Sequence, residues 1–549
     1  MLEDLDLSNI QDENARQLIV RLLNLVEAVS ADLRDAQAEI QRLRDENNRL
    51  KGEQGKPKIK ANTAKPPRVD YSSEKERRKP QPRQKKAKKA TLEIHREQTL
   101  EVEKASLPSD AEFKGYEDVV VQDVILRADN VCFHKEKYWA DSTGQTYLAE
   151  LPRGYEGQFG PGLKALTLTL YFGGGMSEPK IRDLYENIGV QISKGQVSNL
   201  LVKGQDAFHA EKKEVCEAGL QSGPWHHIDQ TSTRVNGQNQ HCTIVCNPAY
   251  TIYTTTPHKD RLSVLDVLRN GRARRFRLND EALGYLAAVP LSKTMRTWLA
   301  AESSDQDWNE QTFVARLDAN WPNLGAPQRQ AILSAAAVAA YHADESLVPV
   351  PLLLADDAPQ FNWIARELAL CWVHEGRPYK KLMPVFVHHL KLLKDFRKQF
   401  WDFYDELLAY QQNPTPEESA RLEAEFDRLF STRTGFDALD DRIAKTYAKK
   451  AFLLLVLKYP EIPLHNNPVE LEARQRVRKR DISFGPRTQD GVNAWDTFMS
   501  LAATTSKLGI SFYQYIHDRI SKANQIPSLA NLIEARASEL GLGASWSVA

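Results

Sequence analysis

Three acidic positions that are far apart in the sequence could together support metal-dependent chemistry. Asp229 stands at the expected end of a strand, either Asp356 or Asp357 ends the next clear strand, and Glu470 lies in the first turn of a late helix. Carboxylates at strand ends and at a helix start can converge on one point, where they would bind hard divalent cations such as Mg²⁺. Two such ions about 4 Å apart can activate an attacking oxygen and stabilise the leaving oxygen of a phosphodiester. The sequence therefore predicts a two-metal site, with the choice between Asp356 and Asp357 open.

Each of these residues also has an ordinary structural interpretation. A single Asp at a strand end is more often a turn former or a helix cap, and Asp357 directly precedes Ala358 and Pro359. Glu470 could simply complement the helix dipole, with Asn467 as the N-cap and Pro468 in the first turn. Spacing alone does not decide between these interpretations.

The helix that begins near Asn467 is strongly basic after its first turn, with five cations between Arg474 and Arg480. Glu470 and Glu472 are two positions apart, or about 200° around a helix, so only one of them can face a metal. Arg474, Arg478 and Lys479 are predicted to contact DNA phosphates beyond Glu470. The alternative is a solvated helix face with an ion pair four residues apart between Glu470 and Arg474.

The N-terminal segment 1–50 carries an apolar heptad repeat that predicts a parallel two-stranded coiled coil. The a positions are Ile19, Val26, Leu33, Ile40 and Asn47, and the d positions are Ala15, Leu22, Val29, Ala36, Leu43 and Leu50. We expect this helix to pair two or more copies of the chain. The alternative is one amphipathic helix that packs on its own domain.

Charge is segregated along the chain, although the formal net charge of the 549 residues is zero. Residues 51–90 contain 15 Lys or Arg and 4 Asp or Glu. Such a segment cannot bury enough apolar surface to fold, so 51–95 is predicted to be a basic disordered linker that either binds phosphate or serves as a spacer.

The number of cysteines and the length of the apolar runs indicate in which cellular compartment the protein is expected. The five cysteines are too few and too scattered for a disulfide framework, and the longest apolar runs, such as 451–457, are far shorter than a membrane span. The acidic N-terminus does not resemble a signal peptide. We expect a soluble cytoplasmic protein.

Between 96 and 210 the pattern changes twice. Short alternating segments between 113 and 152 predict a small β module within 96–155. Within 156–210, a helix from about Glu178 to Ile188, a turn at Gly189 and a helix opened by Ser193 predict a helix-turn-helix. Its second helix would present three polar residues to DNA: Lys194, Ser198 and Asn199.

The remaining chain predicts a mixed domain over 211–520 and a helical tail over 521–549. A hairpin with an Asn-Gly turn occupies 225–256, helical patterns fill about 263–345 and 379–460, and a single strand lies between these helical segments. The fold class is thus a multidomain α+β protein.

Four blocks of sequence carry a resemblance to a known family. The blocks "HIDQTSTRVNG", "LLADDAPQF", "LCWVHEGRPYKKL" and "NNPVELEARQRVRKRDISFG" resemble the signature blocks of bacterial insertion-sequence transposases of the sixty-six family. The order of the upstream segments is also similar: a zipper, a basic linker, a zinc-ribbon-like β module and a helix-turn-helix.

The resemblance implies DNA transposition and an RNase-H-like catalytic core, with helical insertions at about 263–345 and 379–460. The Asp-Asp-Glu triad of that family corresponds to Asp229, Asp356 and Glu470, with Asp357 as the rival for the second position. Mg²⁺ or Mn²⁺ would be the cofactor, and the partners would be the terminal inverted repeats, target DNA, a second copy of the chain and accessory proteins of the same element. His374 and Arg377 lie in a matching block and are candidate DNA contacts.

The chain also departs from the family pattern. Gln230 and Thr233 stand where the family usually has Glu and an aromatic residue, and the ribbon lacks its two Cys-x-x-Cys pairs, so no zinc is expected. Cys242 and Cys246 are predicted to be small core residues on one strand face. These departures favour an alternative, a relative that binds and pairs DNA but no longer cuts it. A coiled-coil scaffold without nucleic-acid function would leave the triad and the arginines unexplained.

Overall fold

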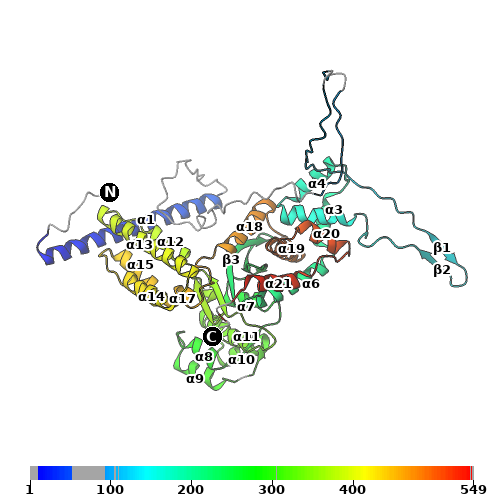
Figure 1. Ribbon diagram of the computed structural model, residues 1–549. Helices are drawn as coiled ribbons and strands as arrows, with labels where there is room; N and C mark the ends of the chain where they lie inside the picture. The colour runs from blue at the N-terminus through cyan, green and yellow to red at the C-terminus, as the bar shows by residue number, and fades with distance from the viewer. Residues whose placement is uncertain are drawn as a thin grey trace.

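The computed structural model describes residues 10–51, 93–103, 107–108, 111–304, 306–543 and 546. They form a mixed α/β multidomain protein built around one mixed sheet (Figure 1). The predicted basic linker over 51–95 lies almost entirely outside the described residues. Within the part of the chain that is described, no helix combines the length and apolar character needed to cross a membrane.

The elements before the central sheet belong to three regions. They are α1 (Glu13–Leu50); β1 (Lys137–Ala140) and β2 (Gln145–Leu148); and α3 (Pro161–Leu168), the π-helix η4 (Thr169–Gly173), α4 (Glu178–Asn187), α5 (Lys194–Val202) and α6 (Asp206–Gln221). The hairpin β1–β2 projects away from the rest of the molecule on the right of Figure 1.

The central sheet has the strand order β5-β4-β3-β8-β9. Its strands are β3 (Trp225–Val235), β4 (Gln238–Asn247), β5 (Tyr250–Thr256), β8 (Leu352–Ala355) and β9 (Glu367–Leu370). Strands β3, β4 and β5 pair antiparallel, whereas β8 pairs parallel to both β3 and β9. The predicted Asn-Gly turn joins β3 to β4, and both Asn236 and Gly237 have positive φ, as a type I′ hairpin turn requires.

A first helical segment separates β5 from β8. It contains α7 (Arg261–Leu268), β6 (Arg275–Phe276), α8 (Asp280–Leu286), α9 (Lys293–Ala301), β7 (Trp308–Asn309), α10 (Glu310–Asn320) and the Ala-rich α11 (Ala326–His342). The helical pattern predicted over 263–345 is therefore present, with one short strand pair that the sequence did not indicate.

A second helical segment follows β9. It contains α12 (Trp372–Lys381), α13 (Val387–Gln412), α14 (Pro416–Phe430), α15 (Asp437–Tyr447), α16 (Lys450–Leu453) and α17 (Leu455–Lys458). The chain then returns to the sheet through α18 (Asn467–Ser483) and α19 (Gln489–Lys507), and it ends with α20 (Phe512–Ile520) and α21 (Leu529–Leu540). The short 3₁₀ turn η5 (Pro359–Phe361) lies between β8 and β9.

Two predicted features of the chain need correction. Most of the expected β module is absent, because residues 111–136 form no strand and only β1 and β2 pair. Apolar residues of this stretch are largely exposed, as Val121 and Ile125 illustrate at 79% and 82%. Alternation alone does not make a strand when the described chain offers no neighbouring strand to pair with. In addition, β3 does not end near Asp229 but continues to Val235, because its partner β4 continues alongside.

Candidate metal centre

The parallel pairing of β3 with β8 brings Asp229 and Asp356 to one place. The register pairs His227 with Leu354, and the same step of two residues along each strand leads to Asp229 and Asp356. Asp229 therefore lies in the middle of β3 but just past the end of its parallel partner. Side chains two residues apart point to the same face of a sheet. Asp229 and Asp356 therefore point to the same face as His227 and Leu354.

Asp357 occupies a different environment from Asp356. Its side chain is 57% exposed and lies 2.5 Å from Lys449 Nζ. Asp356 is half-buried, and its Oδ1 accepts a hydrogen bond from Ala358 N at 3.3 Å. Burial, the β8 register and the neighbouring charges all favour Asp356 as the partner of Asp229.

Helix α12 places Arg377 and His374 beside the carboxylate of Glu470. Arg377 Nη2 donates to both oxygens of Glu470, at 3.3 and 3.1 Å, and His374 Nε2 lies 3.5 Å from Oε1. Burial, followed by the nearby Arg377, lowers the pKa of His374. The ion pair of Glu470 is thus with Arg377, rather than with Arg474 on its own helix.

Asn466 holds the start of α18 against the sheet. Its Nδ2 donates to Ile228 O at 2.9 Å, and its Oδ1 lies 2.8 Å from His227 Nδ1. Its backbone N–H donates to Cys371 Sγ at 3.2 Å. Asn466 is the N-cap and 1% exposed, so α18 begins one residue earlier than the sequence suggested. These contacts fix the first turn of α18, and Glu470 with it, beside the part of β3 that leads to Asp229.

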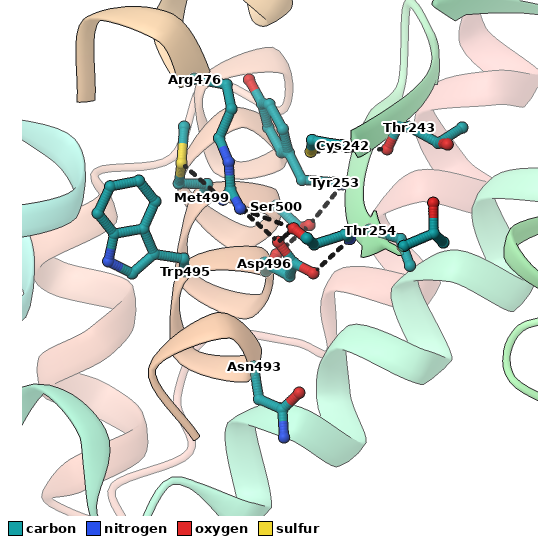
Figure 2. A network of polar contacts seen from close by, with 12 residues as sticks. Cys242, Thr243, Tyr253, Thr254, Arg476, Asn493, Trp495, Asp496, Met499 and Ser500 are labelled. Atoms are coloured by element: carbon teal, nitrogen blue, oxygen red, sulfur yellow. Dashed lines mark hydrogen bonds and ion pairs between the residues drawn. The ribbon is translucent and has the colours of Figure 1, made fainter. Parts of the chain in front are cut away.

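Further along α18, two buried contacts fix the helix to β5 and α19 (Figure 2). Arg476 Nη2 lies 3.0 Å from Asp496 Oδ1 and donates to Thr255 Oγ1 at 2.7 Å. Glu472 accepts a 2.6 Å hydrogen bond from Tyr253 OH. Glu472 therefore anchors α18 to the sheet.

The carboxylates of Asp356 and Glu470 both act on the charge of Asp229. Burial, followed by the negative charges of Asp356 and Glu470, raises the pKa of Asp229 to about 6, although the hydrogen bond from Gln230 N opposes the shift. Such a gathering of partly desolvated carboxylates suits a hard divalent cation, which would relieve the repulsion. The donor set therefore fits Mg²⁺ or Mn²⁺.

A second arrangement of possible ligands shares Glu470. The ligand atoms of Cys371, His374 and Glu470 all lie within 4.8 Å of one another. Burial raises the pKa of the Cys371 thiol to about 12, and its sulfur already accepts the N–H of Asn466. Thiolate and imidazole ligands select softer ions than Mg²⁺, so the carboxylate set suits Mg²⁺ better than this one does.

The candidate DNA contacts before the sheet lie on α5. Lys194 and Asn199 are exposed and Ser198 is half-buried. Ser193 and Gln196 form a capping box that starts α5 at Lys194, and Gly189 turns the chain with φ +83° after α4. Both helices and the turn therefore form where the sequence predicts them.

The candidate DNA contacts on α18 divide into two groups. Arg474 and Arg478 are exposed. Lys479, however, is 3% exposed, donates to Tyr171 O at 2.6 Å and to Met176 O at 3.2 Å, and lies over the Tyr171 ring. The prediction that Lys479 contacts phosphate does not agree with this placement, because its ammonium is enclosed between α18 and η4.

Three residues beside the site were missed in the sequence. His227 and Asn466 join β3 to α18, and Gln360 donates to Gln230 Oε1 at 3.1 Å, which ties the loop after Asp356 to β3. The only signals were the His two residues before Asp229 and the paired asparagines before Glu470. Neither signal indicates which residue the side chain contacts, because those partners are far away in the sequence.

Comparison with known proteins gives one informative match. No model of a known protein family matches the chain. Over 321 residues, the chain is 33% identical to the uncharacterized protein y4jO of Sinorhizobium fredii (strain NBRC 101917 / NGR234). The match spans 58% of this chain and 99% of y4jO.

Proposed function

The chain belongs to the same protein family as y4jO of Sinorhizobium fredii, and we propose that it is a metal-dependent DNA transposase of the Asp-Asp-Glu type. It would cut the ends of an insertion sequence and join them to target DNA. Two observations support the proposal: the β3–β8 register that brings Asp229 and Asp356 to matching positions, and the effect of the Asp356 and Glu470 charges on the pKa of Asp229.

The sheet supports the finer fold that the sequence resemblance implies. Three consecutive antiparallel strands, β3, β4 and β5, are extended by the parallel strands β8 and β9 beyond β3. An RNase-H-like core has this arrangement, with acidic residues beside its central strand. Helices inserted between β5 and β8, and between β9 and α18, enlarge that core without interrupting the sheet.

The three carboxylates share one role in the proposed reaction, which is to bind the metal ions. When bound, divalent cations supply Lewis acidity to the attacking and leaving oxygens of a phosphodiester. Asp229 and Asp356 offer ligand oxygens from rigid strands, and Glu470 offers its own from the first turn of α18. Arg377 and His374 orient the Glu470 carboxylate. We also propose that both residues contact the phosphates of bound DNA. Water would attack a phosphodiester at the end of the element and release a 3′-hydroxyl. That hydroxyl would then attack a phosphodiester of the target DNA at the same site, forming a new P–O bond while the 3′-oxygen of the cut target strand leaves.

DNA would lie across the exposed polar residues that flank this site. Lys194, Ser198 and Asn199 on α5 would bind the terminal inverted repeats, and Arg474 and Arg478 would contact the backbone near the cut. We leave Lys479 out of this set because of its burial. Two copies joined through α1 would pair the two ends in the cytoplasm, with accessory proteins of the same element as further partners.

A nicking assay with matched variants tests the proposal. The full chain is incubated with Mg²⁺ or Mn²⁺ and DNA that carries candidate repeat ends, alongside Asp229→Ala, Asp356→Asn and the neighbouring control Asp357→Asn. We expect the wild type and Asp357→Asn to nick the DNA, and the other two variants to lose at least about 100-fold in rate. Nicking that survives Asp229→Ala would contradict the catalytic assignment. DNA binding without any nicking by the wild type would instead support the binding-only alternative.

A further inference from the structure

Phe484, directly after the last turn of α18, is an exposed aromatic residue with a constrained backbone. It is 88% exposed. Its φ of +59° is left-handed, a conformation in which Gly or Asn is usual at the end of a helix. A large aromatic side chain there gains nothing from packing and still bears the backbone strain.

The neighbouring residues hold Phe484 in this position. Its N–H donates to Arg480 O at 2.7 Å and so closes the helix. Gly485 packs so tightly on the hairpin that a Cβ there would lie 2.4 Å from Arg234 O. One residue later, Asn236 N donates to Pro486 O at 3.0 Å. The chain on both sides of Phe484 is therefore fixed, and the ring is presented to solvent from a rigid support.

The distance from Glu470 to Phe484 along α18 follows from the helical rise. Phe484 directly follows the helix and is fourteen positions after Glu470, which is about 21 Å along the helix axis. Arg474 and Arg478 lie between them along α18, on the exposed side of the helix. This face therefore runs from the metal site, past two cations, to an aromatic ring.

The size and chemistry of this face match one strand of bound DNA. A span of about 21 Å corresponds to about six base pairs at 3.4 Å per pair. Arginines that contact phosphate would follow the backbone, and an aromatic ring beyond them would meet a base. Aromatic and other apolar side chains that reach DNA bases stack on them or wedge between them.

We propose that Phe484 stacks on a nucleobase displaced from the duplex, about six nucleotides from the scissile phosphate. This inference depends on the proposed transposase function and adds a specific contact to it. The ring would hold the DNA end open beside the site, while Arg474 and Arg478 hold its backbone.

The test compares variants at Phe484 by DNA binding and by the fluorescence of 2-aminopurine placed singly at positions two to ten nucleotides from the cut. The full chain is used as wild type, Phe484→Gly, Phe484→Trp and Ile482→Ala, the last of which shortens a nearby exposed apolar residue. Phe484→Gly is informative because glycine suits the left-handed backbone and should leave the protein at least as stable.

We expect wild-type binding to raise the fluorescence at one position between four and eight nucleotides from the cut. Phe484→Gly should lose that signal and bind about 5- to 100-fold more weakly, with an unchanged or higher Tm. Phe484→Trp should retain the binding, and Ile482→Ala should behave as wild type.

Three results would overturn the inference. The first is a Phe484→Gly variant with wild-type affinity and an unchanged 2-aminopurine signal. The second is a Phe484→Gly variant that changes only the oligomeric mass, which would assign the ring to a contact between copies of the chain. The third is a wild type that binds no DNA, which would remove the proposed function as well. The first two outcomes leave the nicking activity intact. A failure of the Phe484 proposal can therefore be distinguished from a failure of the proposed transposase function.

Discussion

Asp356 and Asp357 show the limit of predicting a single site residue from sequence. Both follow the same apolar strand, and the sequence left the choice open. The parallel register of β3 and β8 separates them, because one step along a strand moves a side chain to the opposite face. Strand pairing over more than a hundred residues of sequence separation cannot be read from local pattern.

The cations of α18 show that a clear sequence pattern can also mislead. The prediction for Lys479 was wrong. The basic composition of 474–480 predicts an exposed helix face. In the structure Arg476 and Lys479 are 1% and 3% exposed. Arg476 is buried against Asp496, and Lys479 against the backbone carbonyls of Tyr171 and Met176. The partners lie on α19, on η4 and in the loop after η4, so composition alone could not identify the buried cations.

Lys479 predicts a specific pH dependence of stability. Burial lowers the pKa of Lys479 to about 7, whereas in the unfolded chain it would stay near 10.5. Between these values the unfolded state binds a proton that the folded state does not, so the free energy of unfolding should rise with pH. Relative to Lys479→Met, which has no titrating group, the wild type should gain more than about 1 kcal/mol from pH 7 to pH 9.

Urea denaturation at several pH values measures this difference. The matched control is Lys194→Met, which removes an exposed lysine from α5 and should follow the wild type at every pH. Parallel pH profiles for the wild type and Lys479→Met would show that Lys479 keeps its ordinary proton affinity in the folded chain.

At the scale of elements, α19 covers the edge of the sheet with regularly spaced acceptors. Strand β5 is an edge strand, and its outward N–H groups at Thr251, Tyr253 and Thr255 donate to side chains on α19. The acceptors are Thr504, Ser500 and Asp496, one every four residues. Four helical residues rise about 6.0 Å and two strand residues about 6.8 Å, so the two spacings match over this length.

This arrangement predicts that Ser500 contributes to stability through an edge amide. In Ser500→Ala, Tyr253 N–H would lose its acceptor inside a buried contact (Figure 2). We expect a loss of about 1–3 kcal/mol in the free energy of unfolding. The control is Ser506→Ala on the same helix, where the side chain is exposed and the change should stay within about 0.5 kcal/mol. Equal unfolding free energies for the two variants would contradict the role of Ser500.

Other elements were predictable to different degrees. The helices around Gly189, the Asn236-Gly237 turn and the burial of Cys242 and Cys246 on β4 were predicted from local sequence and are present. Each depends on residues close in sequence, such as the capping box at Ser193. The extent of β3 and the existence of β9 depend on strand partners, and these were missed.

At the scale of the whole molecule, α1 uses the side opposite to its heptad seam to dock on the second helical segment. Glu27 Oε1 accepts from the N–H groups of Val385 and Phe386 at the start of α13, and Asn24 bonds with Gly435 O and Asp437 N at the start of α15. Several seam residues, among them Leu33, Ile40 and Leu43, are about half exposed. Packing on its own chain and pairing with a second copy are therefore compatible, because they use different faces.

The exposed seam predicts the effect of substitutions on self-association. Leu33→Asn combined with Ile40→Asn should convert a dimer or larger assembly to a single chain, as measured by light scattering, without lowering the stability of that chain. Leu23→Asn, on the docked and buried face, should instead lower stability. A wild type that is already monomeric, or a double variant with unchanged mass, would exclude the zipper.

The central claim, that Asp229, Asp356 and Glu470 form one divalent-metal site, can be tested most directly by metal-directed cleavage of the polypeptide. Fe²⁺ replaces Mg²⁺, and ascorbate with peroxide then generates radicals that cut the chain close to the bound ion. We predict cuts near all three residues, each suppressed by excess Mg²⁺ and by Asp229→Asn. Cuts near only one of the three residues, or cuts that Asp229→Asn leaves unchanged, would contradict a shared site.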